Sequence, residues 1–268
     1  MQRRLTRQEN TRDFKSYWKT YFEDRAGTLS ILKSCKVNGF IDAILVECID
    51  ATIRKIILHR GWQIIVDCGC GDGSVTGPLV NQGIRVIGID FSGQMCELAK
   101  SHQIETVCKD LNVLEDQSIH HLLGIDSASG NSIALVFCES LGCLPQPLNT
   151  LTRSARLNPT TSMVVSFPNQ DSILRRIVSR VERSKLNYFG LSCLRDQLAL
   201  QGRQVNTITA IFSFPFLFSF GIQLNALSRI RKLLMRLLAS NWVVVIEPEE
   251  YFHPQSVSRL TYGEQLPA

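Results

Sequence analysis

The spacing of apolar residues changes along the chain close to Gly61. Over residues 14–22 and 41–57, apolar side chains recur at steps of three and four, which predicts two or three amphipathic helices. After Gly61, short runs of β-branched residues alternate with segments of helical spacing, which predicts a parallel sheet joined by right-handed crossovers. The pattern therefore predicts an α/β fold with a helical N-terminal segment.

Seven strands are expected from these runs, at residues 64–67, 85–90, 106–109, 133–138, 162–167, 205–211 and 242–246. Beyond the fifth strand, the spacing favours helices over residues 172–184, 191–201 and 222–239. A chain of 268 residues has room for one large α/β domain, with or without a lid. We expect a helical cap over residues 1–60 and one domain over residues 61–268, with a lid inserted near residues 170–240.

Composition and charge are those of an ordinary globular protein. Hydrophobic residues make up 44% and charged residues 20%, and no apolar run reaches the ~18 residues that a membrane span needs. Residues 1–10 are rich in arginine but lack the apolar core of a signal peptide. Nine cysteines at irregular spacing favour free thiols in the cytoplasm. The net charge of +5 would suit an anionic substrate, although solubility explains it equally well.

A glycine-rich loop follows the first expected strand and carries the strongest chemical signal. From Asp67 to Ser74 the sequence reads Asp-Cys-Gly-Cys-Gly-Asp-Gly-Ser and leads into a helical segment. Alternate glycines let the backbone turn sharply and approach a ligand, while amides at a helix N-terminus favour its negative groups. The next strand ends in Asp90, where a carboxylate can accept hydrogen bonds from ribose hydroxyls. Loop and acid together indicate a cofactor that contains adenosine.

A nicotinamide dinucleotide is the main competitor among such cofactors. Its binding loop has the pattern Gly-x-Gly-x-x-Gly, and here Ser74 occupies the third glycine position. A dinucleotide also needs room and compensating charge for its pyrophosphate. The loop therefore favours a methyl donor over a dinucleotide.

Several segments between Gly61 and Asn169 resemble class I S-adenosylmethionine-dependent methyltransferases. Residues 67–73 resemble motif I of these enzymes, residues 89–95 their ribose-binding strand end, and residues 109–111 the segment beside the adenine. Residues 138–145 and 164–169 look like the loop after the fourth strand and the fifth strand of ubiquinone-pathway and other small-molecule members. The resemblance implies a Rossmann-like, seven-stranded, mostly parallel sheet with helices on both faces and an antiparallel last strand.

The resemblance also implies S-adenosyl-L-methionine as the cofactor and a set of residues that bind it. Loop glycines would surround the methionine part, an acid would hold the ribose, and the residues after it would pack near the adenine. The expected donor-binding residues are Asp67, Gly69, Cys70, Gly71, Gly73, Asp90, Phe91, Met95, Asp110, Leu111 and Cys138. Where such enzymes often carry Leu-x-His after the fourth strand, this chain has Leu-Gly-Cys, so no histidine base or metal ligand is expected there.

The expected reaction is in-line transfer of a methyl group to a small acceptor, at an oxygen atom. Most of the catalytic effect then comes from positioning the reactants. Glu139 is the candidate residue that orients the acceptor or accepts its proton. The competing interpretation is that Glu139 is a solvated carboxylate in a loop. N-methyl transfer to a small molecule, donor binding without transfer, and nicotinamide-dependent oxidoreduction are the competing functions. Nucleic acid is not expected as a partner, since the Asn/Asp-Pro-Pro-aromatic motif of base-amino methyltransferases is missing.

A phenylalanine-rich segment lies on the expected acceptor side. Five phenylalanines stand at alternate positions from Phe212 to Phe220, and Pro215 among them indicates an edge strand or an extended loop. The next helical segment carries four basic residues and no acid between residues 229 and 236. We expect this region to cover an apolar or aromatic acceptor, with Phe214 and Phe216 as contacts; contact with a membrane surface and plain core packing also fit the pattern.

Overall fold

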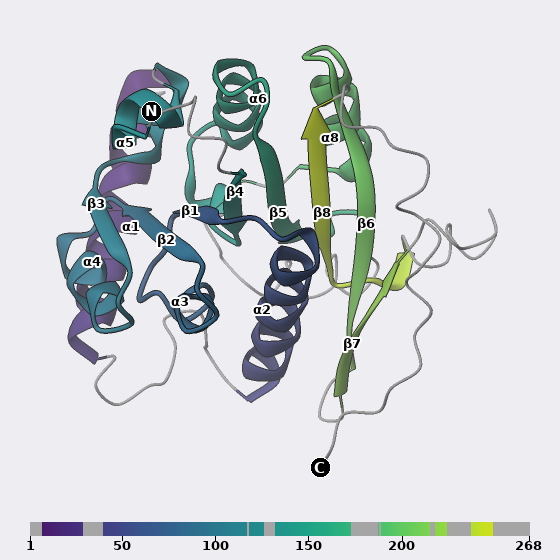
Figure 1. Ribbon diagram of the computed structural model, residues 1–268, viewed down its shortest axis with the longest axis horizontal. Helices are drawn as coiled ribbons and strands as arrows, with labels where there is room; N and C mark the ends of the chain where they lie inside the picture. Colours follow the sequence, from purple (N-terminus) through teal and green to yellow (C-terminus); the bar gives the residue numbers. More distant parts are fainter. Residues whose placement is uncertain are drawn as a thin grey trace, which may run out of the picture.

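The structure is a computed structural model that describes residues 7–28, 40–116, 118–125, 132–172, 187, 189–214, 218–223 and 237–248. Its helices are α1 (Arg7–Thr28), α2 (Phe40–Arg60), α3 (Gly77–Val80), α4 (Gly93–Lys100), α5 (Ile119–Leu123), α6 (Pro147–Leu157) and α8 (Leu191–Ala199). Its strands are β1 (Ile64–Cys68), β2 (Arg85–Asp90), β3 (Glu105–Cys108), β4 (Ile133–Cys138), β5 (Ser162–Pro168), β6 (Arg203–Phe214), β7 (Phe218–Gln223) and β8 (Asn241–Pro248) (Figure 1). Two 3-10 helices, η1 (Leu111–Glu115) and η3 (Leu141–Cys143), follow β3 and β4.

The described strands form one sheet in the order β3-β2-β1-β4-β5-β8-β6-β7. The five strands β3, β2, β1, β4 and β5 are parallel to one another, so their carboxyl ends lie at the same end of the sheet. β8 is antiparallel to both β5 and β6. The expected mixed sheet with a parallel core and an antiparallel last strand is confirmed.

The expected count of seven strands is wrong, because the segment after Phe214 adds an eighth. β6 extends to Phe214, and β7 returns antiparallel beside it at the edge of the sheet. Alternating phenylalanines suit extended backbone, and the place of β7 at the edge of the sheet agrees with the edge strand that the sequence allowed here. The helix expected over residues 222–239 therefore overlaps β7, and residues 224–236 lie outside the described residues, as does nearly all of the helix expected at 172–184.

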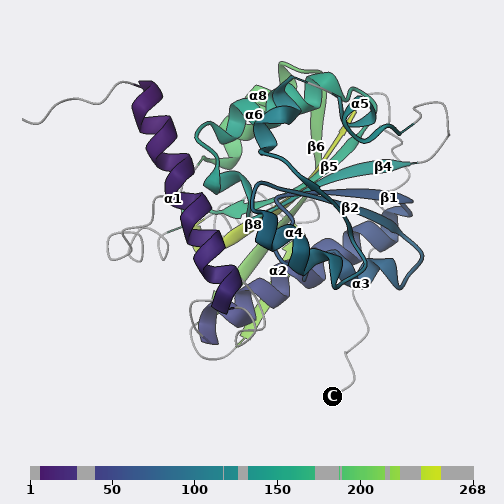
Figure 2. The ribbon, with the colours of Figure 1, turned by 90° about the vertical axis from the view of Figure 1, so that its left-hand side faces the viewer.

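Helices cover both faces of the sheet. All residues of β1 and β4 are buried, so their side chains alternate between two apolar layers. Val66 packs in the layer formed with α5, α6 and α8, whereas Ile65 packs in the layer formed with α2, α3 and α4 (Figure 2). Burial on both faces explains why these strands read in the sequence as continuous apolar runs.

The two N-terminal helices occupy different places. α2 belongs to one helical layer of the sheet: Ile49, Ile53 and Ile57 are at most 1% exposed and pack with Ile211 and Val243. α1 contacts α4 and lies across the carboxyl ends of the parallel strands (Figure 2). None of the helices in the described ranges combines the length and the apolar composition that crossing a membrane requires.

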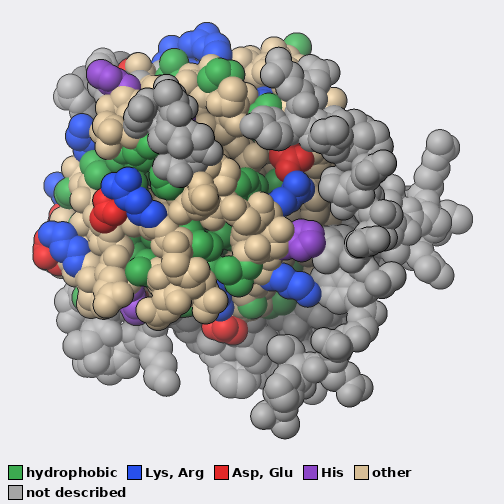
Figure 3. All heavy atoms as spheres, viewed as in Figure 1, with side chains coloured by type: hydrophobic (Ala, Val, Ile, Leu, Met, Phe, Trp, Pro, Cys, Tyr) green, Lys and Arg blue, Asp and Glu red, His purple; other side chains and the backbone are tan. Residues whose placement is uncertain are grey.

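Charged side chains on the face drawn in Figure 3 are spread out. Basic groups of the described residues lie at separate places on that face, some of them beside acidic groups. Arg85 and Glu105, on neighbouring strands, form an ion pair at 2.7 Å with both side chains about half exposed. Such exposed pairs contribute on the order of 0–1 kcal/mol each. An exposed pair of this kind therefore adds little to the stability of the fold.

Candidate functional site

A pocket opens at the carboxyl ends of the parallel strands, where the strand order reverses between β1 and β4. Such a reversal leaves a crevice in which open α/β sheets bind ligands. The loop after β1, the ends of β2 and β4, the segment after β3 and one face of α1 contribute its walls. The lining residues are Lys15, Trp18, Phe22, Gly69, Gly71, Asp90, Phe91, Asp110, Leu111, Cys138, Glu139, Ser140, Cys143, Leu144 and Pro145.

Most of the site residues expected from the sequence meet in this pocket. Those that line it are Gly69, Gly71, Asp90, Phe91, Asp110, Leu111, Cys138 and Glu139. They come from four separate segments of the chain, each at or just after the carboxyl end of a parallel strand. The sheet order therefore brings together residues that the sequence could only associate by resemblance.

Four expected donor-binding residues, Asp67, Cys70, Gly73 and Met95, are not among those that line the pocket. All four are buried. Asp67 accepts a hydrogen bond from the Thr76 hydroxyl at 2.7 Å, which ties the end of β1 to the segment before α3. Met95 is fully buried on α4. These residues are packed behind the loop and the start of α4 and support their shape. Other parts of the loop line the pocket.

Gly69 has a conformation and a position that only glycine satisfies. Its φ is +83°, and its amide donates to the carbonyl of Ile89 at 2.7 Å, so the loop is held against β2. A Cβ at Gly69 would lie 2.5 Å from the Cβ of Ser140, closer than any real contact allows. Ser140 in turn donates from its hydroxyl to the carbonyl of Cys68 at 2.6 Å. The backbone after β1 therefore contacts the side chain of Ser140, which lies in the segment after β4.

Asp90 organises the backbone around it. Its two carboxylate oxygens accept from the amides of Gly71 at 3.0 Å and Ser92 at 2.9 Å, and the side chain of Ser92 caps α4. Asp90 is only 6% exposed. Burial raises the pKa of this carboxyl, and the backbone amides of Ser92, Gly71 and Phe91 oppose part of that rise. Each oxygen keeps a second lone pair, so the carboxylate can still accept from a ligand hydroxyl.

Helix α1 closes one side of the pocket; the sequence favoured a helical cap over residues 1–60 but did not indicate which of its residues meet the site. Lys15 forms an ion pair with Asp110 at 2.8 Å, and the ring of Phe22 meets that of Phe91 edge to face at 6.1 Å between centroids. Trp18 also lines the pocket and is 8% exposed. The four-residue spacing of the aromatic residues in this helix was visible in the sequence. Which part of the sheet they meet was not, because spacing gives no direction in space.

Glu139, the expected catalytic residue, follows β4 in a strained conformation. Its φ is +54°, a left-handed value that costs a residue with a Cβ about 1–2 kcal/mol. Its amide donates to the hydroxyl of Ser166 at 2.9 Å, and its carboxylate accepts from the side-chain amide of Asn241 at 3.2 Å. Strain of this kind persists where neighbouring contacts over-determine it, and it is frequent at functional sites. Two other strands therefore hold Glu139 at the pocket.

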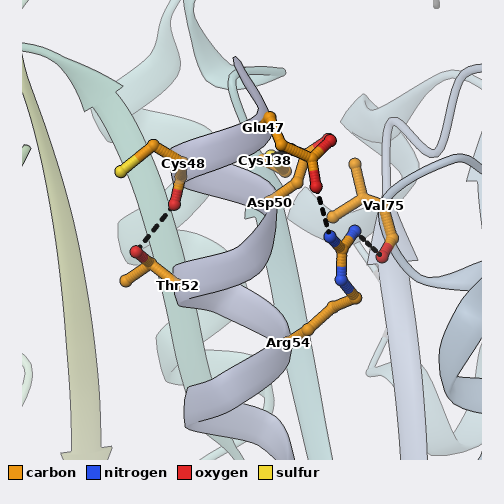
Figure 4. Close-up of polar contacts among 7 residues, drawn as sticks. All are labelled: Glu47, Cys48, Asp50, Thr52, Arg54, Val75 and Cys138. Carbon is orange, nitrogen blue, oxygen red and sulfur yellow. Dashed lines mark hydrogen bonds and ion pairs between the residues drawn. The ribbon is translucent and has the colours of Figure 1, made fainter. Parts of the chain in front are cut away.

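Helix α2 also contacts the end of β4, at the pocket. The Cys138 thiol donates to the carboxylate of Asp50 at 3.5 Å, and Asp50 is 4% exposed (Figure 4). One turn further along α2, Arg54 donates to the carbonyl of Val75 at 3.3 Å and pairs with Glu47 at 3.2 Å (Figure 4). α2 therefore ties the end of β4 to the segment that follows the glycine loop. Sequence reasoning missed Asp50, since a lone acid in an apolar helix gives no sign of its partner.

The expected acceptor contacts are only partly placed. The backbone of Phe214 pairs with Phe218 in the β6–β7 hairpin. The side chain of Phe214 and the whole of Phe216 lie outside the described residues. Within the described part of the chain, no group of three or more His, Cys, Asp or Glu side chains is arranged to hold a metal ion.

Comparison with known proteins places residues 65–158 in a family described as methyltransferase domain. The ubiquinone biosynthesis O-methyltransferase of Haemophilus ducreyi is 29% identical over 111 residues, which cover 40% of this chain and 45% of that protein. The enzyme of the same name from Vibrio cholerae is 28% identical over 94 residues, 35% of this chain and 36% of that protein. The matches therefore span less than half the length of these relatives.

Solved structures share the fold over most of the chain. Magnesium protoporphyrin IX methyltransferase from Synechocystis PCC 6803, with bound SAH, has a TM-score of 0.57 at 15% identity and covers 88% of this chain and 99% of that one. A 1,6-didemethyltoxoflavin-N1-methyltransferase from Burkholderia thailandensis has a TM-score of 0.54 at 12% identity and covers 92% of each chain. With the strand order and the pocket at its reversal, these matches show that the chain contains a class I S-adenosylmethionine-dependent methyltransferase domain.

Proposed function

We propose that the protein transfers a methyl group from S-adenosyl-L-methionine to an oxygen atom of a small, apolar or aromatic acceptor. The observation that carries the donor assignment is the arrangement around Asp90. Its buried carboxylate is fixed by the amides of Gly71 and Ser92, and Gly71 lines the pocket with it. A pair of vicinal ribose hydroxyls is the group that such a fixed acceptor suits.

The charge of the pocket supports a cationic donor over a dinucleotide. Three acids, Asp90, Asp110 and Glu139, line the pocket, and Lys15 is the one basic residue among its described lining. A sulfonium with its α-amino group gains from this field, whereas a pyrophosphate with two negative charges loses from it. A nicotinamide cofactor is therefore disfavoured by electrostatics as well as by the loop pattern.

Donor binding on this proposal divides among three groups of residues. Gly69 and Gly71 hold the methionine part, Asp90 holds the ribose, and Phe91, Asp110 and Leu111 surround the adenine. Asp67, Cys70, Gly73 and Met95 act indirectly, by shaping the loop and α4. α1 adds Trp18 and Phe22 as a cover that keeps water from the adenosine end.

The donor brings an activated methyl group, and the chain's own residues position the acceptor. Glu139 is the carboxylate we assign to the acceptor side, since Asn241 and Ser166 hold it at the pocket. There it can accept a hydrogen bond from an acceptor hydroxyl and take its proton as the oxygen is methylated. Cys138, Ser166 and Asp50 form a chain of hydrogen bonds behind it, with Ser166 donating to Cys138 at 3.7 Å.

The acceptor class rests on both the pocket and the relatives. Cys143, Leu144 and Pro145 give the pocket an apolar wall beside Glu139, and we add Phe214 and Phe216 as proposed contacts. The curated relatives are named as O-methyltransferases, which supports oxygen, while the structural neighbour named as an N1-methyltransferase keeps N-methyl transfer as the second candidate. We place the protein in the cytoplasm, because nine cysteines at irregular spacing favour free thiols.

Paired binding measurements test this proposal without knowledge of the acceptor. S-adenosylmethionine and S-adenosylhomocysteine differ in the sulfonium charge, so Glu139→Gln should weaken binding of the first by several-fold and leave the second nearly unchanged. NAD should not bind. If the variant bound each ligand with the same affinity as the wild type, Glu139 would not lie near the sulfonium.

Turnover then separates an enzyme from a protein that only binds the donor. Labelled methyl transfer should be found with at least one member of a panel of phenols, carboxylic acids and ring nitrogens. With the acceptor found in this panel, Phe214→Ala should raise the KM for the acceptor and leave the affinity for the donor unchanged. Liposome binding that disappears in Phe214→Ala, with soluble-acceptor kinetics intact, would support a membrane-surface role for the hairpin instead.

A further inference from the structure

Two cysteines lie at the turn that carries Asp90 and Phe91. Cys96 is on α4 and is 3% exposed, while Cys108 ends the edge strand β3 and is exposed. Cys108 is the register partner of Asp90 across β2 and β3, and α4 begins two residues after Phe91. The short connection from β2 to α4 therefore brings both thiols to the same turn.

The two thiol groups contact consecutive carbonyls of the same turn. The Cys96 thiol donates to the carbonyl of Asp90 at 3.6 Å, and the Cys108 thiol donates to the carbonyl of Phe91 at 3.9 Å. Helix α4 also packs against β3, so the two side chains are neighbours. A buried thiol beside an exposed one is the arrangement that a resolving cysteine and an accessible cysteine need.

We propose that Cys96 and Cys108 form a site of oxidative modification, at which a hydroperoxide converts the two thiols into a disulfide that links α4 to β3 and weakens donor binding. Formation of the disulfide does not depend on the function proposed above. Its effect on the donor does, because that effect acts through Asp90.

The oxidation proceeds in two steps, and Cys108 reacts first. Burial and the nearby charges of Asp90 and Cys108 raise the pKa of Cys96 to about 12, so Cys96 stays a thiol while exposed Cys108 meets the oxidant. The Cys108 sulfur attacks the peroxide, an S–O bond forms as the O–O bond breaks, and an alcohol or water leaves. The Cys96 sulfur then displaces the sulfenic oxygen, which leaves as water with the thiol proton. In total, two thiols and one hydroperoxide give one disulfide, one alcohol and one water.

The disulfide changes the turn for a geometric reason. Its sulfur atoms are about 2.05 Å apart, far closer than two thiols in contact, and the bond removes both S–H donors from the carbonyls of Asp90 and Phe91. α4 and β3 must draw together at the point where Asp90 is fixed. By linkage, a donor that binds the reduced form better also opposes formation of the disulfide by the same factor.

Other cysteines around the pocket are less suited to this chemistry. Cys68 and Cys70 are at most 3% exposed, so an oxidant does not reach them in the folded protein. Cys193 is exposed like Cys108 but lies on α8, which packs against β6 toward the opposite edge of the sheet. Cys193→Ser is therefore a matched control for reaction at an exposed thiol.

The test treats the full-length protein with hydrogen peroxide and follows both the cross-link and the donor site. Peptide mass spectrometry of the alkylated wild type should find a peptide pair joined through Cys96 and Cys108, two hydrogen masses lighter than the reduced pair. The cross-link should be absent in Cys108→Ser, retained in Cys193→Ser and reversed by dithiothreitol. Cys96→Ser alters a buried position. If Cys96→Ser does not fold, Cys108→Ser alone decides the test.

Calorimetry with S-adenosylhomocysteine is the second part of the test. The oxidised wild type should bind several-fold more weakly than the reduced protein, and Cys108→Ser should show no dependence on peroxide. Accumulation of sulfenic or sulfinic acid on Cys108 without a cross-link would overturn the proposed pair. A cross-link that leaves the affinity unchanged would overturn the coupling to the donor, whereas a reduced protein that binds no donor at all would count against the proposed function alone.

Discussion

Lys15 on α1 and Asp110 after β3 form an ion pair at 2.8 Å although 95 positions separate them in the sequence. The other oxygen of Asp110 accepts from the amide of Asn112 at 3.0 Å and caps η1. One carboxylate thus holds both the 3-10 helix that carries Leu111 and the N-terminal helix that covers the pocket. The first prediction concerns this link.

Lys15→Met should lower the affinity for S-adenosylhomocysteine by about two- to fivefold, since a pair whose side chains are 40% and 43% exposed contributes on the order of 0.2–1 kcal/mol. Affinity of the wild type should also fall with added salt, and that dependence should shrink in the variant. Calorimetry at low and high ionic strength measures both. Lys19→Met, which removes an exposed partner of Glu23 on the same helix, is the control and should leave the donor affinity unaltered.

Asp90→Ala should weaken donor binding by roughly ten- to a hundredfold, because loss of a charge-assisted acceptor for two hydroxyls costs about 1.5–3 kcal/mol. The variant also loses the acceptor for the amides of Gly71 and Ser92, so its melting temperature should fall. Asp196→Ala, at an exposed acid on α8, is the comparison and should change neither quantity. Unchanged affinity in Asp90→Ala would show that the ribose lies elsewhere.

The pH dependence of donor binding should follow Asp90. Burial raises the pKa of its carboxyl above the ordinary value of 3.8, so protonation begins at a higher pH than in the unfolded chain. The native state then binds the extra proton, and this group's contribution to stability decreases as pH rises from 3.8 through the raised value. The ligand has the opposite requirement: affinity for S-adenosylhomocysteine should fall as pH drops through that value. Affinity that rises toward acid in the wild type would contradict this assignment.

Gly69→Ala should abolish donor binding and destabilise the fold, since its Cβ would lie 2.5 Å from that of Ser140 at a φ of +83°. Gly83→Ala separates strain from collision, because Gly83 has a φ of +79° and no atom within 4 Å of the added Cβ. The control should lose only the ~1–2 kcal/mol of a left-handed residue and keep its affinity. Chemical denaturation and calorimetry distinguish the two, and equal loss of stability in both would argue against the contact with Ser140.

Glu139→Gly should be more stable than Glu139→Ala by about 0.5–1 kcal/mol, because the left-handed penalty of ~1–2 kcal/mol exceeds the extra entropy of an unfolded glycine. Both variants lose the hydrogen bond from Asn241, so the difference isolates the backbone. Gln103, the other described non-glycine residue at positive φ, should show the same order without any effect on the donor. Thermal unfolding of the two pairs decides the point, and alanine more stable than glycine at 139 would refute the strain.

The local elements of the parallel core could be predicted because each is determined by short-range physics. Strands buried on both faces need continuous apolar residues, and the runs at 85–90 and 133–138 match β2 and β4 residue for residue. The sharp turn after β1 needs residues that tolerate positive φ, and Gly69, Gly71 and Gly73 all have it. The acid at the end of β2 then follows from its spacing and strand.

The remainder depended on how the elements pack. α1 reads as an amphipathic helix, yet its role in the pocket arises from contacts of Lys15 and Phe22 with residues far along the chain. The phenylalanine-rich segment indicated an edge strand or an extended loop, but its antiparallel pairing with β6 depended on how the strands pack. Asp50 became part of the site only when α2 packed over the end of β4. Sequence by itself thus determined the backbone conformation of the core strands and of the glycine-rich loop, since these follow from neighbours along the chain. The tertiary structure alone decided which distant side chains face one pocket, because periodicity states which face of an element is apolar and not what that face meets.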